Sequence, residues 1–166
     1  MVENKVLEKI VNTLHKNCKL TLEQVAAIAE LSVAETGAVI DELEKDGTIL
    51  GYGAVVNWEK VPNHNKVTAY IELKVTPQRH NGFNRIASQI YQYPEVKSLN
   101  LMSGSYDFGV TVEGDSIKDI SLFVSDHLAT MDSVLSTATH FVLKCFKDDG
   151  VIFETPKEDD REVISL

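Results

Sequence analysis

Two consecutive helix-start signals constrain the fold of this chain more than any other feature of its sequence. Thr21 with Gln24, and Ser32 with Glu35, each match the capping box, in which a hydroxyl and a side chain three residues later satisfy the first amides of a helix. The second box begins about two residues after the first helix loses its apolar pattern. A tight turn must therefore join the two helices, and the spacing predicts a helix-turn-helix.

The segments on either side extend this first domain. Residues 2–14 show one apolar stripe at helical spacing, and Gly47 is a natural end for the last helix. Residues 48–58 are rich in β-branched and aromatic residues, with glycines at 51 and 53, which predicts the bent strands of a wing. The polar, turn-forming residues 62–66 mark a boundary. We therefore expect a winged helix-turn-helix over residues 1–61.

The hydrophobic pattern changes after this boundary. Stretches that alternate like strands now interleave with two amphipathic stretches at helical spacing. In chain order they are a strand at 67–75, a helix at 83–93, strands at 96–102 and 108–112, a helix at 117–128 and a strand at 134–146. The order β-α-β-β-α-β predicts a ferredoxin-like domain over residues 62–147.

Such a sheet buries one face under its own helices and leaves the other face free. We expect the free face, with Tyr70 and its neighbours, to be apolar and to drive dimerisation. Residues 148–166 form an acidic tail with short apolar groups. Two interpretations stay open for it: a solvated tail, or an extra edge strand at 151–153 that docks on the sheet or on a partner subunit.

Composition excludes several classes of protein. No stretch approaches the ~18 apolar residues that a membrane helix needs, and the first residues lack the apolar centre of a signal peptide, so we expect a cytoplasmic protein with no membrane partner. Cys18 and Cys145 form no CxxC pair, and the five histidines show no HxxxH spacing. We expect neither a metal site nor a cofactor.

Net charge is −9, and its distribution matters more than its total. Residues 1–60 carry 6 Lys and Arg against 10 Asp and Glu, residues 61–147 carry 8 against 8, and residues 148–166 carry 2 against 7. DNA affinity comes largely from basic side chains that neutralise phosphates. The expected helix-turn-helix is therefore unusually acidic for a DNA-binding domain.

The chain resembles the Lrp/AsnC (feast/famine) family of transcription regulators over about residues 6–146. The similar stretches are LSVAETGAVIDELEKDGTILGY in the first domain, and MSGSYDFGV and SVLSTATHFVL in the second. The resemblance implies an α+β fold, with an N-terminal winged helix-turn-helix followed by a ferredoxin-like βαββαβ domain of the RAM (regulation of amino-acid metabolism) type. It also implies a DNA-binding transcription regulator that responds to a small effector, an amino acid, and that forms homodimers and higher oligomers.

The resemblance places the effector at the SGSYD turn, between dimers. Gly104 and Ser105 would offer amides to a carboxylate, Asp107 would accept from the ammonium, and Tyr106 would cover the side chain. Thr137 and Thr139, on one face of the last strand, match threonines that face the effector in the family. The alternative is an ordinary β-turn in which Asp107 satisfies loop amides and Tyr106 is packed.

The recognition helix departs from the family pattern. Residues 33–46 contain one basic residue, Lys45, and five acidic residues. The negative charge of these acidic side chains would repel the DNA phosphates. Binding of double-stranded DNA could instead use the amino-terminal end of this helix together with the basic residues that precede the second helix. The candidate DNA-contacting residues are Lys16, Lys19, Ser32, Thr36, Val39 and Lys45.

Two functions remain open from the sequence. The first is the effector-gated, DNA-binding regulator. The alternative is a non-enzymatic amino-acid-binding or assembly module whose degenerate helix-turn-helix does not bind DNA, which the acidic helix favours. An enzyme is not expected, because no nucleophile-base pair, phosphate loop or carboxylate dyad appears in the sequence.

Overall fold

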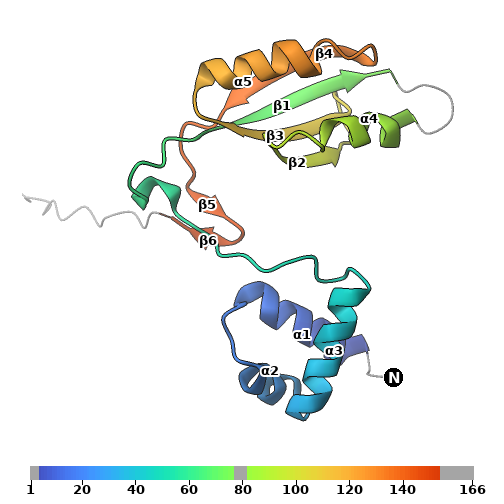
Figure 1. Cartoon of the computed structure of the whole chain (residues 1–166), viewed down its shortest axis with the longest axis vertical. Helices are drawn as coiled ribbons and strands as arrows, with labels where there is room; N and C mark the ends of the chain where they lie inside the picture. Colours follow the sequence, from blue (N-terminus) through green and yellow to red (C-terminus); the bar gives the residue numbers. More distant parts are fainter. Residues whose placement is uncertain (1–3, 77–81, 154–166) are drawn as a thin grey trace, which may run out of the picture. The chain divides into compact units, whose positions relative to one another are not determined.

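The computed structural model describes residues 4–76 and 82–153, which form two compact units (Figure 1). The division between the units falls after residue 56, whereas the sequence placed the boundary after residue 61. No helix in the described ranges is both long and apolar enough to cross a membrane.

The first unit is built from three helices, α1 (Asn4–Lys16), α2 (Leu22–Ala29) and α3 (Val33–Lys45). Both predicted capping boxes form. The Thr21 hydroxyl accepts from the Gln24 amide at 3.4 Å, and the Thr21 amide donates back to Gln24 Oε1 at 2.9 Å. Ser32 and Glu35 repeat the same pair of bonds at 3.2 and 3.0 Å. Local capping chemistry therefore fixes where α2 and α3 begin.

The turn between α2 and α3 is short because Glu30 takes a left-handed conformation (φ 61°) at the end of α2. At the far end of α3, Asp46 caps the helix, and Gly47 follows with φ 79°. The three helices bury one apolar cluster, which consists of Ile10, Leu14, Val25, Ala29, Val39 and Leu43. The predicted helix-turn-helix is thus present, with α1 packed against it.

The strands expected for the wing are not formed. Between α3 and the 3₁₀ turn η1 (Trp58–Lys60), no described residue is assigned to a strand, and Leu50 is 93% exposed. Side-chain contacts tie the middle of this segment to the helical unit: Tyr52 donates to Glu44 Oε1 at 2.7 Å, and the Cys18 thiol donates to the Gly53 carbonyl at 3.3 Å. A two-stranded ribbon without further cover is marginal in water, so β-propensity alone does not produce the wing.

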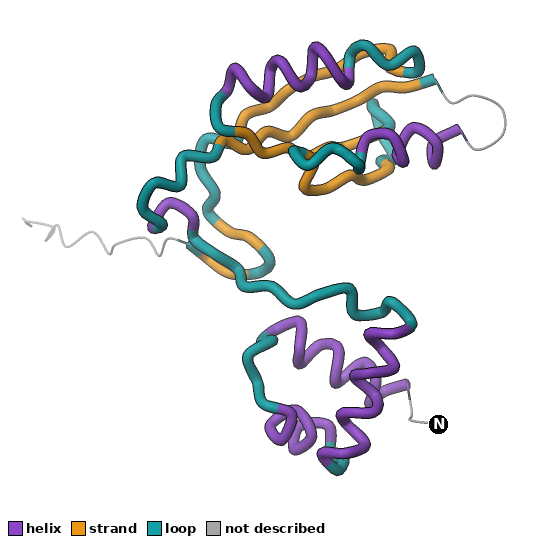
Figure 2. The backbone as a smooth tube through the Cα atoms, in the orientation of Figure 1, coloured by secondary structure: helices purple, strands orange, loops and turns teal. Residues whose placement is uncertain are grey.

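The second unit contains a four-stranded antiparallel sheet with the order β2-β3-β1-β4. Two helical segments cover one of its faces (Figure 2). The elements are β1 (Val67–Val75), α4 (Gly82–Ile90), β2 (Val96–Leu101), β3 (Phe108–Gly114), α5 (Ile117–Phe123) with its π-helical continuation η2 (Val124–Leu128), and β4 (Val134–Phe141). The predicted β-α-β-β-α-β order is confirmed.

Alternation along β1 decides which residues enter the core. Ala69, Ile71, Leu73 and Val75 are buried, and they pack with the apolar residues of α4, α5 and η2. Their strand partners share this face because directly paired residues point the same way. The remaining positions of each strand therefore form the opposite, free face of the sheet.

The expectation that the free face is apolar was wrong. Its residues are Thr68, Tyr70, Glu72, Lys74, Ser98, Asn100, Gly109, Thr111, Glu113, Ser136, Ala138 and His140. Polar side chains contact one another on this face, with His140 Nε2 lying 3.4 Å from Glu72 Oε1. Each strand puts its apolar positions under the helices, so polar positions dominate on the other side, and Tyr70 is its one large aromatic side chain.

The last predicted strand is shorter than expected, because β4 ends at Phe141 rather than at residue 146. Beyond it, β5 (Lys147–Asp148) pairs with β6 (Val151–Ile152) across a turn in which Asp149 and Gly150 both have positive φ. This Asp-Gly turn is the type that favours a tight hairpin. Residues 151–152 thus pair with their own chain rather than with the main sheet, and 154–166 lie outside the described residues.

Candidate functional site

Asp107, the candidate ammonium acceptor, holds the end of β1. Its Oδ2 accepts from the Val75 amide at 2.8 Å, and its own amide donates to the Leu73 carbonyl at 2.9 Å. Its carbonyl accepts from the Met102 amide at 2.7 Å, which closes the turn between β2 and β3. The carboxylate therefore serves the fold, but through the amide of a strand residue rather than through the loop amides of the alternative interpretation.

Tyr106 contacts Tyr70, which lies on the free face of the sheet. Its hydroxyl is hydrogen-bonded to the Tyr70 hydroxyl at 3.0 Å, and the two rings meet edge to face with centroids 6.4 Å apart. This hydrogen bond, with partial burial, raises the pKa of Tyr70 to about 12. Tyr70 lies over Gly109, where an added Cβ would come within 2.0 Å of the Tyr70 hydroxyl. Glycine is therefore needed at 109 for Tyr70 to reach Tyr106.

The tip of the turn is open. Gly104 and Ser105 are exposed, and among the described residues no atom outside Gly104 and its two chain neighbours lies within 4 Å of the position that a Cβ at Gly104 would occupy. Their exposure leaves this part of the turn accessible to a ligand.

Thr137 and Thr139 do share one face of β4, as the two-residue spacing indicates. They pair with Leu73 and Ile71, so they lie on the helix-covered side of the sheet. Tyr106, by contrast, meets Tyr70 on the free side. Within one chain, the two threonines and Tyr106 therefore do not converge on one site.

Two of the candidate DNA contacts belong to the core instead. Thr36 is fully buried and donates its hydroxyl to the Ser32 carbonyl at 3.0 Å, and Val39 is 5% exposed within the apolar cluster. Neither side chain is accessible to DNA in this arrangement. Val39 was a candidate because it matches an exposed recognition-helix position of the family, and Thr36 because it lies near the amino-terminal end of the helix. Both are buried because α3 packs more of its circumference than a single stripe suggests.

The remaining candidates are at the surface. Lys16, Lys19 and Lys45 are exposed, and Ser32 uses its hydroxyl in the cap of α3. The exposed side of α3 also carries Ala34, Ala38, Asp41 and Glu42. On its flank, Glu44 accepts from Tyr52, a bond that raises the pKa of Tyr52 to about 12. The surface that would approach DNA thus remains predominantly acidic.

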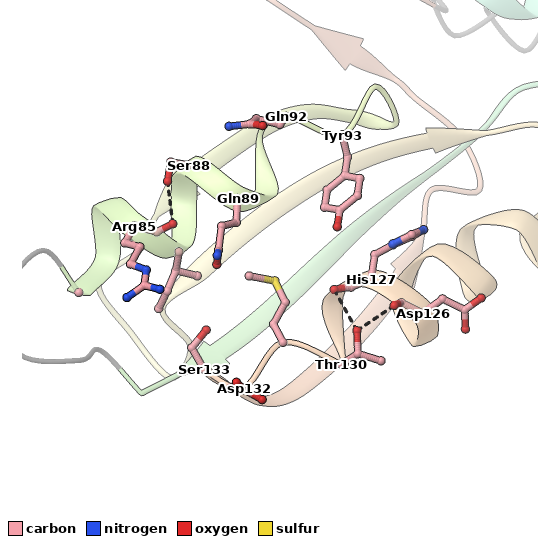
Figure 3. Close-up of a pocket in the computed structure, with 13 residues that line it drawn as sticks. Arg85, Ser88, Gln89, Gln92, Tyr93, Asp126, His127, Thr130, Asp132 and Ser133 are labelled. Atoms are coloured by element: carbon pink, nitrogen blue, oxygen red, sulfur yellow. Dashed lines mark hydrogen bonds between the residues drawn. The ribbon is translucent and has the colours of Figure 1, made fainter.

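A groove of about 800 Å³ lies between α4 and η2 (Figure 3). It contains none of the residues singled out from the sequence. Its lining includes Arg85, Gln89, Tyr93, His127, Met131 and Asp132. These residues belong to no recognisable sequence motif. The sequence indicated only that the second domain has two amphipathic helices, each with polar side chains along one side.

No metal centre is evident in the part of the chain that the structure describes, since it contains no group of three or more His, Cys, Asp or Glu side chains suited to a metal ion. Cys18 and Cys145 are free, partly buried thiols.

Comparison with known proteins gives consistent results. Residues 68–152 match the family model described as the Lrp/AsnC ligand binding domain. The chain is 47% identical over 157 residues to the uncharacterized HTH-type transcriptional regulator YugG of Bacillus subtilis (strain 168), covering 95% of both chains. It is 28% identical over 141 residues to the HTH-type transcriptional regulator FL11 of Pyrococcus furiosus, covering 85% of this chain and 89% of that protein.

Solved structures share the fold. The transcriptional regulator NMB0573 of Neisseria meningitidis, solved as a complex with L-Met, superposes with a TM-score of 0.68 at 24% identity, covering 89% of this chain and 94% of that one. The structure of PH0061 superposes with a TM-score of 0.74 at 21% identity, covering 89% and 97%.

Proposed function

The chain belongs to the Lrp/AsnC family of transcription regulators, and on this premise we propose that it is a cytoplasmic regulator that binds double-stranded DNA under the control of an amino-acid effector. The observation that carries this function is the 47% identity to an HTH-type regulator over 95% of both chains. The capped α2–α3 pair supplies the DNA-binding element, without strands of a wing. The family's regulators are not enzymes.

The acidic side of α3 limits how this element can bind. Lys16 and Lys19 before α2, and Lys45 at the end of α3, supply the phosphate contacts, while Ser32 lies at the amino-terminal end of α3, where the helix dipole favours a phosphate. Few basic contacts make the affinity of one dimer weak. Assembly into homodimers and higher oligomers compensates, because linked sites raise the effective concentration.

The effector in this proposal binds at the SGSYD turn. A carboxylate has two oxygens, so Asp107 can hold the Val75 amide with Oδ2 and an ammonium with Oδ1. Gly104 and Ser105 supply amides at the open tip, and Tyr106 lies beside them. Since Thr137 and Thr139 face the other side of their own sheet, they contribute to such a site from a second copy of the chain.

A gel shift at low and high salt, with and without each of the twenty amino acids, tests this function. We expect retarded DNA at low salt and a change in mobility or affinity with one class of amino acid. Asp41→Lys with Glu42→Arg should strengthen non-specific binding and steepen its salt dependence, because two repulsive charges become attractive.

Unchanged DNA affinity in that double variant would mean that α3 does not approach DNA. Absence of any shift in either protein, with amino-acid binding retained, would favour the assembly module over the regulator.

A further inference from the structure

The groove between α4 and η2 has an Arg and an Asp toward one end, and two aromatic side chains together with Asp126 toward the other. Arg85 on α4 and Asp132 after η2 lie toward the first end, and Tyr93 and His127 toward the second (Figure 3). Gly82, the first residue of α4, also lines the groove, so the positive end of the α4 dipole adds to the charge of Arg85. A molecule with a zwitterionic head and a hydrophobic body matches this distribution.

The two charged groups are available for a ligand. Both side chains are exposed, and within residues 4–76 and 82–153 neither the Arg85 guanidinium nor the Asp132 carboxylate makes a hydrogen bond or an ion pair. The other carboxylate of the lining, Asp126, already accepts from Ser125 through Oδ1 at 2.9 Å. Arg85 and Asp132 are therefore the two permanently charged side chains of the lining that have no partner among the described residues.

The hydrophobic part of the groove is preorganised. The rings of Tyr93 and His127 lie 4.9 Å apart, and both pack on the buried Phe123 at 5.3 and 5.5 Å. Ile86 is 4% exposed, and Met131 is half-buried in the lining. A thioether adapts its shape and contacts aromatic rings favourably, while fixed rings offer edge-to-face packing to a further ring. Although most of the lining is polar, this part of the groove can therefore pack against an aromatic side chain.

We propose that this groove is a ligand site for an aromatic amino acid, formed within a single protomer. Arg85 binds the α-carboxylate, Asp132 accepts from the ammonium, and the ring of the ligand lies over Met131 toward Tyr93. The groove volume of about 800 Å³ falls within the range of small-molecule sites, roughly 300–1,000 Å³. The site shares no residue with the SGSYD turn and does not depend on the effector role of that turn.

Titration calorimetry of the full chain with L-phenylalanine tests the site. We expect saturable binding, with weaker binding of 3-phenylpropionate, which lacks the ammonium, and of phenethylamine, which lacks the carboxylate. Arg85→Gln and Asp132→Asn should each weaken L-phenylalanine by about tenfold or more, as expected for lost hydrogen bonds between charged groups. Lys118→Gln is the matched control, because it removes one positive charge from an exposed position on α5 outside the groove.

The variant Asp107→Asn separates this site from the proposed effector turn. Binding of L-phenylalanine that survives Asp107→Asn but is lost in Arg85→Gln supports the groove. Loss in Asp107→Asn with wild-type affinity in Arg85→Gln would place the ligand at the turn and overturn the inference. Absence of binding at about 10 mM ligand, where even a millimolar Kd is saturated, would overturn it as well, whatever the gel shift shows.

Discussion

The turn between β2 and β3 and the groove between α4 and η2 both present polar groups at the rim of the same unit, yet they differ in how much of this chemistry the fold already uses. At the turn, Asp107 holds the Val75 amide and Tyr106 holds Tyr70. In the groove, Arg85 and Asp132 have no such partner among the described residues. Polar side chains in a turn that resembles a family's ligand turn can thus be used for contacts within the fold. Charged side chains outside any recognised motif can remain without such contacts.

Asp107 should give the largest effects, because its carboxylate is assigned both a fold contact and a ligand contact. Asp107→Ala leaves the Val75 amide unpaired and should lower the free energy of unfolding by about 1–3 kcal/mol. Asp107→Asn keeps an acceptor oxygen but loses the charge, so it should fold nearly as stably while weakening the effector about tenfold to a hundredfold. Urea unfolding and calorimetry with the best-binding amino acid measure the two effects.

Equal effector affinity in Asp107→Asn and wild type would return Asp107 to a purely structural role. Loss of folding together with binding in the Asn variant would show that the charge itself holds the turn.

Gly109 should be the next most sensitive position of the turn region. Gly109→Ala places a Cβ against the Tyr70 hydroxyl and should destabilise the second unit by about 1–3 kcal/mol through overpacking. Gly104→Ala is the matched control at the open tip and should change little. In a Tyr70→Ala background the effect of Gly109→Ala should largely disappear, because the clashing ring is gone. Denaturant unfolding of the four proteins checks this, and an additive cycle would contradict the contact.

The Tyr70–Tyr106 pair predicts a loss of stability at high pH. The hydrogen bond raises the pKa of Tyr70 to about 12 in the folded chain, against about 10 for an unperturbed tyrosine. The neutral phenol is therefore favoured by folding, so the stabilisation is complete below pH 10 and is lost as the pH rises toward 12. Spectrophotometric titration of phenolate should show two late-titrating groups, Tyr52 and Tyr70, and Tyr70→Phe should remove one of them. An unchanged titration curve would mean that Tyr70 is not the group held neutral.

Arg85→Gln should have the smallest effect on folding, which is the counterpart of the prediction for Asp107. An exposed side chain without a partner contributes little, so the free energy of unfolding should change by less than about 0.5 kcal/mol. Thermal and urea unfolding without ligand measure this. A loss comparable to that in Asp107→Ala would show that Arg85 supports the fold and that the contrast between turn and groove is false.

Signals that act over a few residues were readable from the sequence. The two capping boxes fixed the starts of α2 and α3, because the hydroxyl of Thr21 or Ser32 meets an amide only three residues away. The change from period 3.6 to period 2 gave the order of strands and helices in the second unit. The spacing of Thr137 and Thr139 likewise showed that they share a face of their strand.

Contacts between distant residues were decided only by the tertiary structure. Packing of α3 against α1 and α2 buries Thr36 and Val39, and strand pairing turns Thr137 and Thr139 toward the helices rather than toward Tyr106. The partner of Asp107 is a strand amide 32 residues away in the chain, and the groove is lined by both Arg85 on α4 and Asp132 in the turn after η2. Periodicity gives the relative orientation of residues within one element, but it contains no information on which element will cover a given face. The packing of the elements determines which polar groups make contacts within the fold and which remain available to a ligand.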